Sequence, residues 1–322
     1  MIGVLLVNLG TPEAPDAASV RTYLAEFLSD RRVIEIPQLL WQPILRGIIL
    51  RTRPAKSARA YREVWTDAGS PLMAISMRQA AELRERFGNE PIIGLAMRYG
   101  KQSIGSAISK LVDADCDRIL FAPLYPQFCA ATTASATDAL FAQLEKMRFQ
   151  PALRTLPPYF DDPAYIEALR ANLSRQLGAL DFEPQRLLLS FHGMPERTRQ
   201  LGDPYYDQCM ETARLIGEAL GRDVDVAFQS RFGRAKWLEP ATDVMLAAYP
   251  GNGIERIAVA APGFSADCLE TLEELGIRGR DSFLAAGGTH FARLDCLNDS
   301  PEGMTMLEQL VARELEGWRS PT

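Results

Sequence analysis

Short apolar runs alternate along this chain with longer stretches in which apolar and polar residues recur at helical spacing. Apolar runs separated by amphipathic segments are typical of strands in a parallel sheet covered by helices on both faces. The predicted strands are residues 2–8, 92–96, 118–122, 186–191, 224–229 and 256–260. The predicted helices are residues 17–28, 75–87, 103–113, 133–148, 162–177, 206–220, 238–248 and 303–318. The pattern therefore predicts an α/β protein of the doubly wound type.

The second half of the chain repeats features of the first half in the same order. Each half has a strand ending in Gly-x-Pro-Glu, a strand ending in Arg-aromatic-Gly, and a strand ending in Ala-Pro. The pairs are LLVNLGTPE (5–13) with LLSFHGMPE (188–196), AMRYG (96–100) with QSRFG (229–233), and DRILFAP (117–123) with ERIAVAAP (255–262). Three similarities in one order indicate two copies of one α/β unit. Because open α/β sheets bind ligands at the carboxyl ends of their strands, we expect a cleft between two similar domains.

The first copy is longer than the second. From Gly10 to Arg98 is 88 residues, whereas from Gly193 to Arg231 is 38. The additional residues include the apolar segment 36–54, interrupted by prolines, which is either an ordinary buried or hairpin segment or an apolar lip over the cleft that also touches lipid. The predicted domains are 1–150 plus a C-terminal helix at 302–320, with the lip insertion at 36–70, and a second domain at 151–301.

The composition is that of a globular protein and argues against several classes of function. The chain has 322 residues, of which 47% are hydrophobic and 24% are charged, and this length suits two domains. A net charge of −6, with no basic block interleaved with aromatics, argues against nucleic-acid binding. No apolar run is long enough to span a membrane, and the first residues lack the basic leader of a signal peptide.

The five cysteines are scattered without CxxC spacing. An odd, dispersed set of this kind is typical of a reducing compartment, so we expect a cytoplasmic protein. It favours neither a disulfide framework nor a zinc or iron–sulfur site built from cysteine pairs. The cysteines are Cys116, Cys129, Cys209, Cys268 and Cys296.

His192 is one of only two histidines, and it stands where a predicted buried strand ends. It occupies the place that Leu9 has in the first copy. A titratable ring at this position is either a satisfied structural histidine or a group that accepts a proton or binds a metal ion. His290, in GGTHFARL near the end of the chain, is interpreted as structural.

Several carboxylates follow the last predicted strand of the second copy. In PGFSADCLETLEELG (262–276), Asp267 and Glu270 have the spacing of a capping box, which is one interpretation of both residues. Glu270 and Glu274 are four residues apart with Glu273 between them, so three carboxylates share one helical face. Like charges at this spacing oppose helix stability, and the second interpretation is therefore an acidic line that conducts a cation or protons.

Common nucleotide and hydrolase motifs are missing from the two Gly-x-Pro segments. NLGTPE lacks the glycine spacing of dinucleotide-binding and phosphate-binding loops, so nucleotide binding is weakly supported. LSFHG lacks the GxSxG spacing of a nucleophile elbow, and no second histidine stands in a context that would complete a triad.

Together these motifs resemble the ferrochelatase family over nearly the whole chain. In order they are VNLGTPE, GSPL (69–72), MRYG (97–100), LYPQFCAATTAS (124–135), SFHGMPER, GDPYY (202–206), FQSRFGRAKWLEPATD (228–243) and PGFSADCLETLEEL. The resemblance implies a chelatase-like fold of two similar Rossmann-like halves with a cleft between them. It also implies a lyase that inserts Fe²⁺ into protoporphyrin IX, releases two protons and completes haem biosynthesis.

The resemblance assigns roles to particular residues. The family's metal-binding and catalytic pair matches His192 and Glu270. The acidic relay would comprise Glu274, Glu273 and Asp267. The porphyrin-binding positions would be Arg53, Tyr61, Ser70, Arg98, Tyr125, Tyr205, Trp237 and Phe264.

The chain also departs from some members of the family. Arg278 stands where some members have a further acid, and Cys268 stands where some have a histidine. The chain ends in GWRSPT without the clustered cysteines that hold an iron–sulfur cluster in animal-type members. The resemblance therefore implies Fe²⁺ as a substrate, no permanently bound cofactor and no iron–sulfur cluster.

The chemistry of the porphyrin agrees with these assignments. A flat apolar macrocycle with two propionates needs a mostly apolar slot with a few cations or hydroxyls at its rim. Two alternatives stay open, a cobalt or nickel chelatase of a related tetrapyrrole and a two-domain ligand-binding protein without catalysis. The expected partners are the porphyrin and Fe²⁺, without nucleic acid and with peripheral membrane contact through residues 36–54. The sequence does not decide the oligomeric state.

Overall fold

The chain forms two compact units in a computed structural model that describes residues 1–233 and 235–318. The first unit comprises Met1–Tyr125, Cys129–Pro157 and the chain from Leu307 onward, and the second comprises Pro126–Phe128 and Pro158–Met306. The C-terminal helix α12 (Pro301–Glu314) contributes residues to both units. Residues 319–320 of the predicted C-terminal helix lie outside the described residues.

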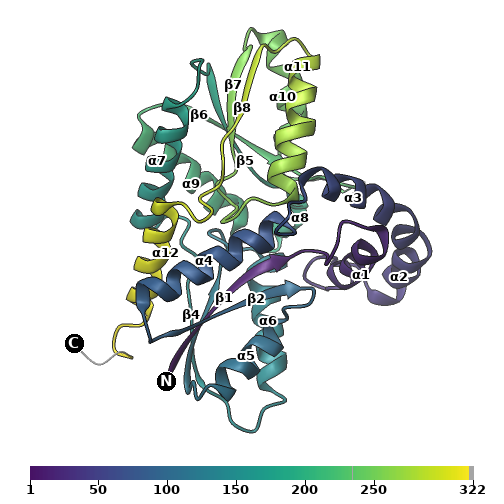
Figure 1. Cartoon of the computed structure of the whole chain (residues 1–322). Helices are drawn as coiled ribbons and strands as arrows, with labels where there is room; N and C mark the ends of the chain where they lie inside the picture. The colour runs from purple at the N-terminus through teal and green to yellow at the C-terminus, as the bar shows by residue number, and fades with distance from the viewer. Residues whose placement is uncertain (234, 319–322) are drawn as a thin grey trace. The chain divides into compact units, whose positions relative to one another are not determined.

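The first unit contains a parallel sheet of four strands in the order β2-β1-β3-β4 (Figure 1). The strands are β1 (Ile2–Gly10), β2 (Ile92–Tyr99), β3 (Arg118–Pro123) and β4 (Ala152–Thr155). The central strand β1 is almost entirely buried, as expected for a continuous apolar run with both faces covered. At its end Gly10 has φ +112°, and a Cβ there would lie 2.0 Å from the Tyr99 carbonyl oxygen, so only glycine fits.

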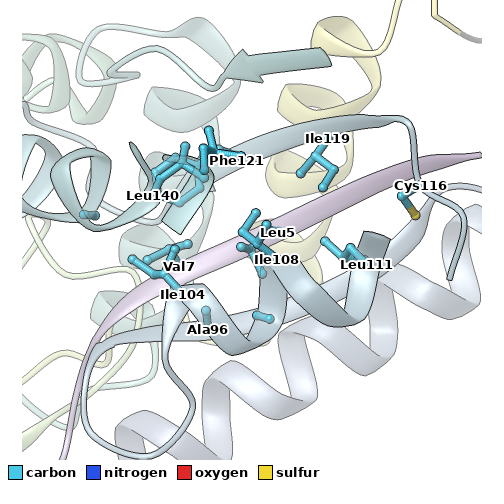
Figure 2. Packing of buried hydrophobic residues seen from close by; sticks show 13 residues of the cluster. Leu5, Val7, Ala96, Ile104, Ile108, Leu111, Cys116, Ile119, Phe121 and Leu140 are labelled. Carbon is cyan, nitrogen blue, oxygen red and sulfur yellow. The ribbon is translucent and has the colours of Figure 1, made fainter. Parts of the chain in front are cut away.

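Helices cover the two faces of this sheet. Figure 2 shows Leu5 and Val7 of β1 packed with Ile104 and Ile108 of α5 and with Leu140 of α6. The helices before β2 are α1 (Ala17–Phe27), α2 (Gln38–Ile44), the π-helix η1 (Leu45–Ile49), α3 (Leu50–Val64) and α4 (Pro71–Phe87). Those after β2 are α5 (Ile104–Asp113), the π-helix η2 (Ala130–Ala134) and α6 (Ser135–Leu144).

The second unit contains a parallel sheet with the same strand order, β6-β5-β7-β8. The strands are β5 (Arg186–His192), β6 (Val224–Gln229), β7 (Arg256–Ala260) and β8 (His290–Arg293). Leu5 of β1 pairs with Phe121, and Leu188 of β5 pairs with Val259, so β3 and β7 align as the repeated motifs predict. The identical order confirms two similar Rossmann-like units.

Helices lie on both sides of the second sheet. Figure 1 shows α7 and α9 on one side and α10 and α11 on the other. The helices are α7 (Pro163–Gly178), α8 (Glu196–Gln200), α9 (Tyr205–Leu220), α10 (Thr242–Ala248), the 3₁₀ turn η3 (Pro250–Asn252), the π-helix η4 (Glu270–Gly279) and α11 (Arg280–Ala285). Asp162 caps α7 by accepting a hydrogen bond from the Ala164 backbone, and Pro163 occupies the first turn.

The lip segment 36–54 lies outside both sheets and is helical, contrary to the interruption that its prolines suggested. Pro43 lies inside α2 and Pro54 inside α3. The π-helical turn η1 follows directly after Pro43, whose missing N–H leaves the α-helical hydrogen-bond series incomplete. The predicted helix at 238–248 also starts late, at Thr242, because Pro240 and Ala241 instead bond to Phe228 of β6.

Candidate metal site

His192 is the last residue of the central strand of the second sheet. Its carbonyl accepts a hydrogen bond from the Tyr205 hydroxyl at 3.0 Å, and the next residue, Gly193, donates its N–H to the Gln229 carbonyl at 2.7 Å. A Cβ on Gly193 would lie 2.5 Å from that carbonyl oxygen, so the close approach requires glycine. The histidine backbone is therefore fixed on both sides.

The contacts of the His192 ring define its tautomer. Nδ1 lies 2.7 Å from the Gly193 carbonyl oxygen, which can only accept a hydrogen bond. In the neutral ring Nδ1 therefore carries the hydrogen, and the lone pair lies on Nε2. The ring is half-buried, with the Phe264 ring centroid 6.5 Å away. This arrangement leaves Nε2 able to bind a metal ion or to accept a proton.

Glu270 begins the π-helix η4, and the structure decides against its interpretation as part of a capping box. The cap position, Leu269, makes no side-chain hydrogen bond. The Asp267 carboxylate instead accepts hydrogen bonds from the Thr271 hydroxyl at 2.6 Å and from Arg293 at 2.9 Å. Glu270 remains half-buried at the first turn of a helix type that is rare and concentrated at functional sites.

Gln229 connects the Glu270 backbone to the sheet and was not predicted as a site residue. It is the last residue of β6, is buried, and pairs with His192 across the sheet. Its Nε2 donates to the Glu270 carbonyl at 3.0 Å, and its Oε1 accepts from the Ser190 hydroxyl at 2.8 Å. One amide thus holds the start of η4 at the strand end that carries His192.

Glu274, the second carboxylate of the predicted line, is held by Ser230. The Ser230 backbone N–H donates to one carboxylate oxygen at 2.8 Å and its hydroxyl donates to the other at 2.5 Å. Ser230 has φ +64°, a conformation that costs energy for a residue with a side chain and that persists only when its surroundings enforce it. A strained backbone bonded to a half-buried carboxylate is typical of a functional site.

The other two predicted relay carboxylates already have cationic partners. Glu273 is buried and pairs with Arg278 at 2.7 Å, and Asp267 is buried and pairs with Arg293 at 2.9 Å. Asp267 also accepts from the Asn298 side chain at 2.7 Å. Arg278 also lies 3.9 Å from the Glu274 carboxylate, so Glu273 and Asp267 are paired more closely with arginines than Glu274 is.

Cys268 is a buried thiol beside Glu270. Burial, reinforced by the adjacent Glu270 carboxylate, raises the pKa of this thiol well above its usual range. The thiol therefore stays protonated near neutral pH in the metal-free protein.

Two predicted porphyrin contacts of the second unit are aromatic side chains close to His192. The Phe264 ring faces the imidazole, and the Trp237 ring lies 3.3 Å from the position that a Cβ on Gly193 would take. The Trp237 Nε1 donates to the Phe232 carbonyl at 2.9 Å, and these two residues help to line a cavity of about 390 Å³. Tyr205 is buried, and its hydroxyl is bonded to the His192 backbone.

Arg98, predicted to bind a propionate, is engaged within the first unit. Its guanidinium pairs with Asp30 at 2.5 Å and donates to the Ser135 hydroxyl at 2.7 Å. Burial opposes ionisation of Asp30, but hydrogen bonds from Ser135, Arg32 and Tyr99 together with the Arg98 charge lower the pKa of this carboxyl. The structure thus gives Arg98 a structural ion pair in place of a free charge.

The other predicted contacts of the first unit differ in exposure. Arg53 is exposed on α3, whereas Tyr61 on the same helix is buried with its ring 6.0 Å from the Trp65 ring. Ser70 is buried at the N-cap position of α4 without a capping hydrogen bond. Tyr125 is half-buried and packs against the core cluster of the first unit.

The lip segment presents apolar side chains to solvent. Leu45 is buried and Ile49 is half-buried, but Ile48 is 57% exposed. Trp41 is buried and donates its Nε1 hydrogen to the Leu28 carbonyl at 2.6 Å. The segment is therefore neither a core helix nor fully exposed.

Residues 1–233 and 235–318 show neither a clustered metal-ligand set nor a membrane-spanning helix. No cluster of three or more histidine, cysteine, aspartate or glutamate side chains there could hold a metal ion. None of the helices in that part of the chain has the length and apolar character needed to cross a membrane.

Comparisons with known proteins agree over nearly the whole chain. The ferrochelatase family model matches residues 1–315. A ferrochelatase of Rhizobium meliloti (strain 1021) is 53% identical over 324 residues, covering 98% of this chain and 96% of that protein. Ferrochelatase 2 of Shewanella oneidensis is 50% identical over 316 residues, covering 96% of each.

Solved structures with similar folds are more distant in sequence. SirB from Bacillus subtilis with Fe³⁺ aligns with a TM-score of 0.56 at 14% identity, covering 78% of this chain and 93% of that chain. CbiX, the terminal enzyme for siroheme biosynthesis in denitrifying bacteria, aligns with a TM-score of 0.52 at 14% identity, covering 98% and 99%. These similarities establish the shared chelatase fold.

Proposed function

We propose, because the chain belongs to the ferrochelatase family, that it inserts Fe²⁺ into protoporphyrin IX to form protohaem. Members of this family are metal chelatases of the lyase class, and their reaction is the final step of haem biosynthesis. Two pyrrole N–H protons leave the macrocycle as the metal ion enters, so the site must both deliver a cation and remove protons. Fe²⁺ is a substrate in this scheme, and the reaction needs no resident cofactor.

The observation that supports this proposal is the 2.7 Å contact between Nδ1 of His192 and the Gly193 carbonyl oxygen. The Gly193 carbonyl holds the hydrogen on Nδ1, which leaves the Nε2 lone pair available. A neutral imidazole can accept one pyrrole proton at this atom, and general-base assistance of this kind contributes roughly 10²–10⁴-fold to rates. The fixed backbone around His192 keeps the ring in one orientation, which is what a proton acceptor requires.

Glu270 and Glu274 supply the negative charge that a divalent cation needs. Their positions four residues apart on η4 place one carboxylate at the start of the helix and the other bonded to Ser230. We assign Glu270 as the metal ligand that works with His192, and Glu274 as the next group in a path for cations or protons. Glu273 and Asp267 take a supporting role in this scheme because both are buried and lie 2.7 Å and 2.9 Å from an arginine, closer than the 3.9 Å between Glu274 and Arg278.

The macrocycle itself requires apolar contacts. In the second unit, the rings of Trp237 and Phe264 offer the flat surfaces on which a porphyrin can lie. In the first unit, we propose the lip segment, including Ile48, as a further apolar contact and Arg53 as a partner for a propionate. We further propose that the reaction takes place in the cytoplasm, in keeping with five free cysteines.

A panel of metals and tetrapyrroles tests the proposal directly. Purified protein is mixed with Fe²⁺, Co²⁺, Ni²⁺ or Zn²⁺ and with protoporphyrin IX or a less apolar tetrapyrrole, and metallation is followed by absorbance. We expect the highest kcat/KM with Fe²⁺ and protoporphyrin IX. Preference for Co²⁺ or Ni²⁺ with another tetrapyrrole would establish the alternative chelatase, and binding without metallation would establish a ligand-binding protein.

A further inference from the structure

We infer that Arg278 excludes divalent cations from Glu273 and Glu274, so that of the two roles proposed for Glu274 only the transfer of protons remains. The role of Glu274 in the reaction rests on the proposed function. The exclusion of cations depends only on contacts within the second unit, and it can be measured without turnover.

One guanidinium reaches both carboxylates. Nε of Arg278 lies 2.7 Å from Oε1 of Glu273, and Nη2 lies 3.9 Å from Oε2 of Glu274. Both nitrogens are bonded to the same carbon of a planar group that carries one delocalised charge. Arg278 therefore lies where a metal ion would have to lie in order to bind both carboxylates.

The exposed fractions of the three side chains place the arginine on the solvent side of the two acids. The Arg278 side chain is 62% exposed, whereas that of Glu274 is 22% exposed and that of Glu273 is 9% exposed. A hydrated ion that approaches Glu274 from solvent therefore meets the positive charge of the guanidinium at the same surface.

The charge on Arg278 is permanent near neutral pH. Burial opposes ionisation, but the hydrogen bond and charge of Glu273, together with the charges of Glu274 and Asp243, raise the pKa of the Arg278 guanidinium. A unit positive charge about 4 Å from a divalent cation weakens binding of that cation about tenfold, even with the dielectric constant of water and physiological salt.

Glu274 still has acceptor capacity that a proton can use. The Ser230 N–H donates to one carboxylate oxygen at 2.8 Å, and the Ser230 hydroxyl donates to the other at 2.5 Å. Each carboxylate oxygen has two lone pairs, so one remains on each. A proton binds such a lone pair without displacing the arginine, whereas a divalent ion that keeps part of its hydration shell needs the space of the guanidinium.

The competing explanation is that Arg278 only stabilises the helix end. It lies in the last turn of η4, where a cation interacts favourably with the helix macrodipole. Arg280 follows two residues later, is exposed, and has its ion pair with Asp281 at 3.8 Å. Arg280→Gln therefore removes the same charge from the same helix end while leaving the contacts of Arg278 in place, which makes it the matched control.

Mn²⁺ binding to the full chain, counted by electron paramagnetic resonance, tests the exclusion, because Mn²⁺ prefers carboxylate and water oxygens. We expect Arg278→Gln to bind an additional Mn²⁺ ion, at least about tenfold more tightly than the wild type binds Mn²⁺ at these acids. Arg278→Glu supplies a further carboxylate and should bind the additional ion more tightly still. Arg278→Lys, which keeps the charge, and Arg280→Gln should both bind Mn²⁺ like the wild type.

A double variant locates the additional ion. Combining Arg278→Gln with Glu274→Gln should remove it, because the cation then lacks one of its two carboxylates. Thermal unfolding of each variant confirms that the chain is folded, as expected for substitutions of an arginine that is mostly exposed.

Three results would overturn the inference. The first is no additional Mn²⁺ ion in folded Arg278→Gln and Arg278→Glu. The second is an equal gain in Arg280→Gln, which would show that only the overall charge matters. The third is an Mn²⁺ ion in the wild type that is lost in Glu274→Gln but retained in Glu270→Gln, because Glu274 would then bind metal despite the arginine.

Excess Mg²⁺ in the metallation assay separates the exclusion of cations from the proposed reaction. Mg²⁺ should lower turnover of Arg278→Gln, by occupying Glu274, and leave that of the wild type and of Arg280→Gln unchanged. An additional Mn²⁺ ion without inhibition by Mg²⁺ would support the exclusion by Arg278 and remove Glu274 from the proposed reaction.

Discussion

The two sheets have the same strand order, but the ends of their central strands differ in chemistry. In the first sheet Asn8 pairs with Met97, and in the second Phe191 pairs with Phe228. The next residues along the neighbouring strands are Arg98 and Gln229, so these two side chains occupy the same place. Arg98 pairs with Asp30 inside its own unit, whereas Gln229 donates to the Glu270 backbone.

This equivalence corrects the alignment of the second repeated motif. The sequence comparison placed AMRYG on QSRFG, which equates Arg98 with Arg231. The strand register shows that Arg231 lies two residues further on, beyond the end of β6, where it is exposed and pairs with Asp243 at 3.1 Å. The first and third repeated motifs keep the alignment that the sequence suggested.

The two units have the same backbone arrangement but different side chains at the ends of their central strands. A glycine that allows close approach of the neighbouring strand ends β1 at Gly10 and directly follows β5 at Gly193. In the first sheet Leu9 precedes the glycine, and Arg98 on the neighbouring strand β2 forms an ion pair with Asp30. The second sheet places His192 there and keeps a neutral amide beside it, so the imidazole has no cationic neighbour at that position. The comparison predicts that chemistry depends on the second unit and that Arg98 chiefly affects stability.

The largest effect is expected for Glu270→Gln. The amide keeps the size of the side chain but removes the charge that binds the cation, so turnover should fall at least about 100-fold with little change in Tm. The matched control is Glu273→Gln on the same helix. Because Arg278 already neutralises Glu273 and is itself largely exposed, the control should retain most activity and lose at most about 1 kcal/mol of stability.

Metallation rates and thermal unfolding of both variants provide the measurement. Equal losses of turnover in the two variants would show that Glu273 also belongs to the acidic relay. They would contradict the expectation that its ion pair with Arg278 keeps it out of that role. Retained activity with a lower Tm in Glu270→Gln would mean that the carboxylate only stabilises the helix.

Arg98→Gln tests the first unit by giving its sheet the residue found in the second. Loss of the guanidinium leaves the buried Asp30 carboxylate without its cation, and unfolding free energy should fall by about 2–3 kcal/mol at pH 7. The lowered pKa of Asp30 stabilises the fold above the ordinary value of 3.8, and this contribution is lost as the pH falls through the lowered pKa.

Urea unfolding at pH 7 and at about pH 3 therefore provides the check, since the difference between wild type and variant should shrink at the lower pH. A raised KM for porphyrin with unchanged stability would instead support the propionate contact that the sequence predicted.

Gln229→Met removes the link between the strand end and η4 while preserving side-chain volume. Ser190 keeps its hydrogen bond with Thr242, so the cost in stability should be about 1 kcal/mol. Misplacement of Glu270 should lower kcat about 10-fold with little change in the KM for porphyrin. A variant with lowered Tm and unchanged kcat would show that the amide has only a structural role.

The smallest effect is expected for Ile48→Ser in the lip segment. Ile48 is more than half exposed, so its loss should hardly change Tm. Burial of part of this side chain against a porphyrin is worth about 1 kcal/mol, and the KM for porphyrin should rise about fivefold in detergent solution. An unchanged KM for porphyrin would show that the lip segment does not contact the porphyrin.

The sequence predicted the buried strands because their apolar runs are continuous, and it missed the edge strands β4 and β8, which are short and largely half-exposed or exposed. It predicted His192 and Glu270 as site residues from their positions after predicted strands and from motif resemblance, and that assignment stays a prediction. It could not reveal the partner of Arg98, since Asp30 is 68 residues away. In the sequence, Gln229 looks like any other polar residue at the end of a strand. Its role depends on a hydrogen bond to the Glu270 backbone carbonyl, which the pattern of side chains cannot reveal.

The most direct test of the account compares His192→Ala with Leu9→Ala, the same position in the two sheets. We expect His192→Ala to stay folded and to lose at least about 100-fold in turnover, because Nε2 no longer accepts a proton or holds the metal. Leu9→Ala should retain turnover, whatever it costs in stability. Near-normal turnover in a folded His192→Ala protein would contradict the central claim that the second sheet places the reacting group at the end of its central strand.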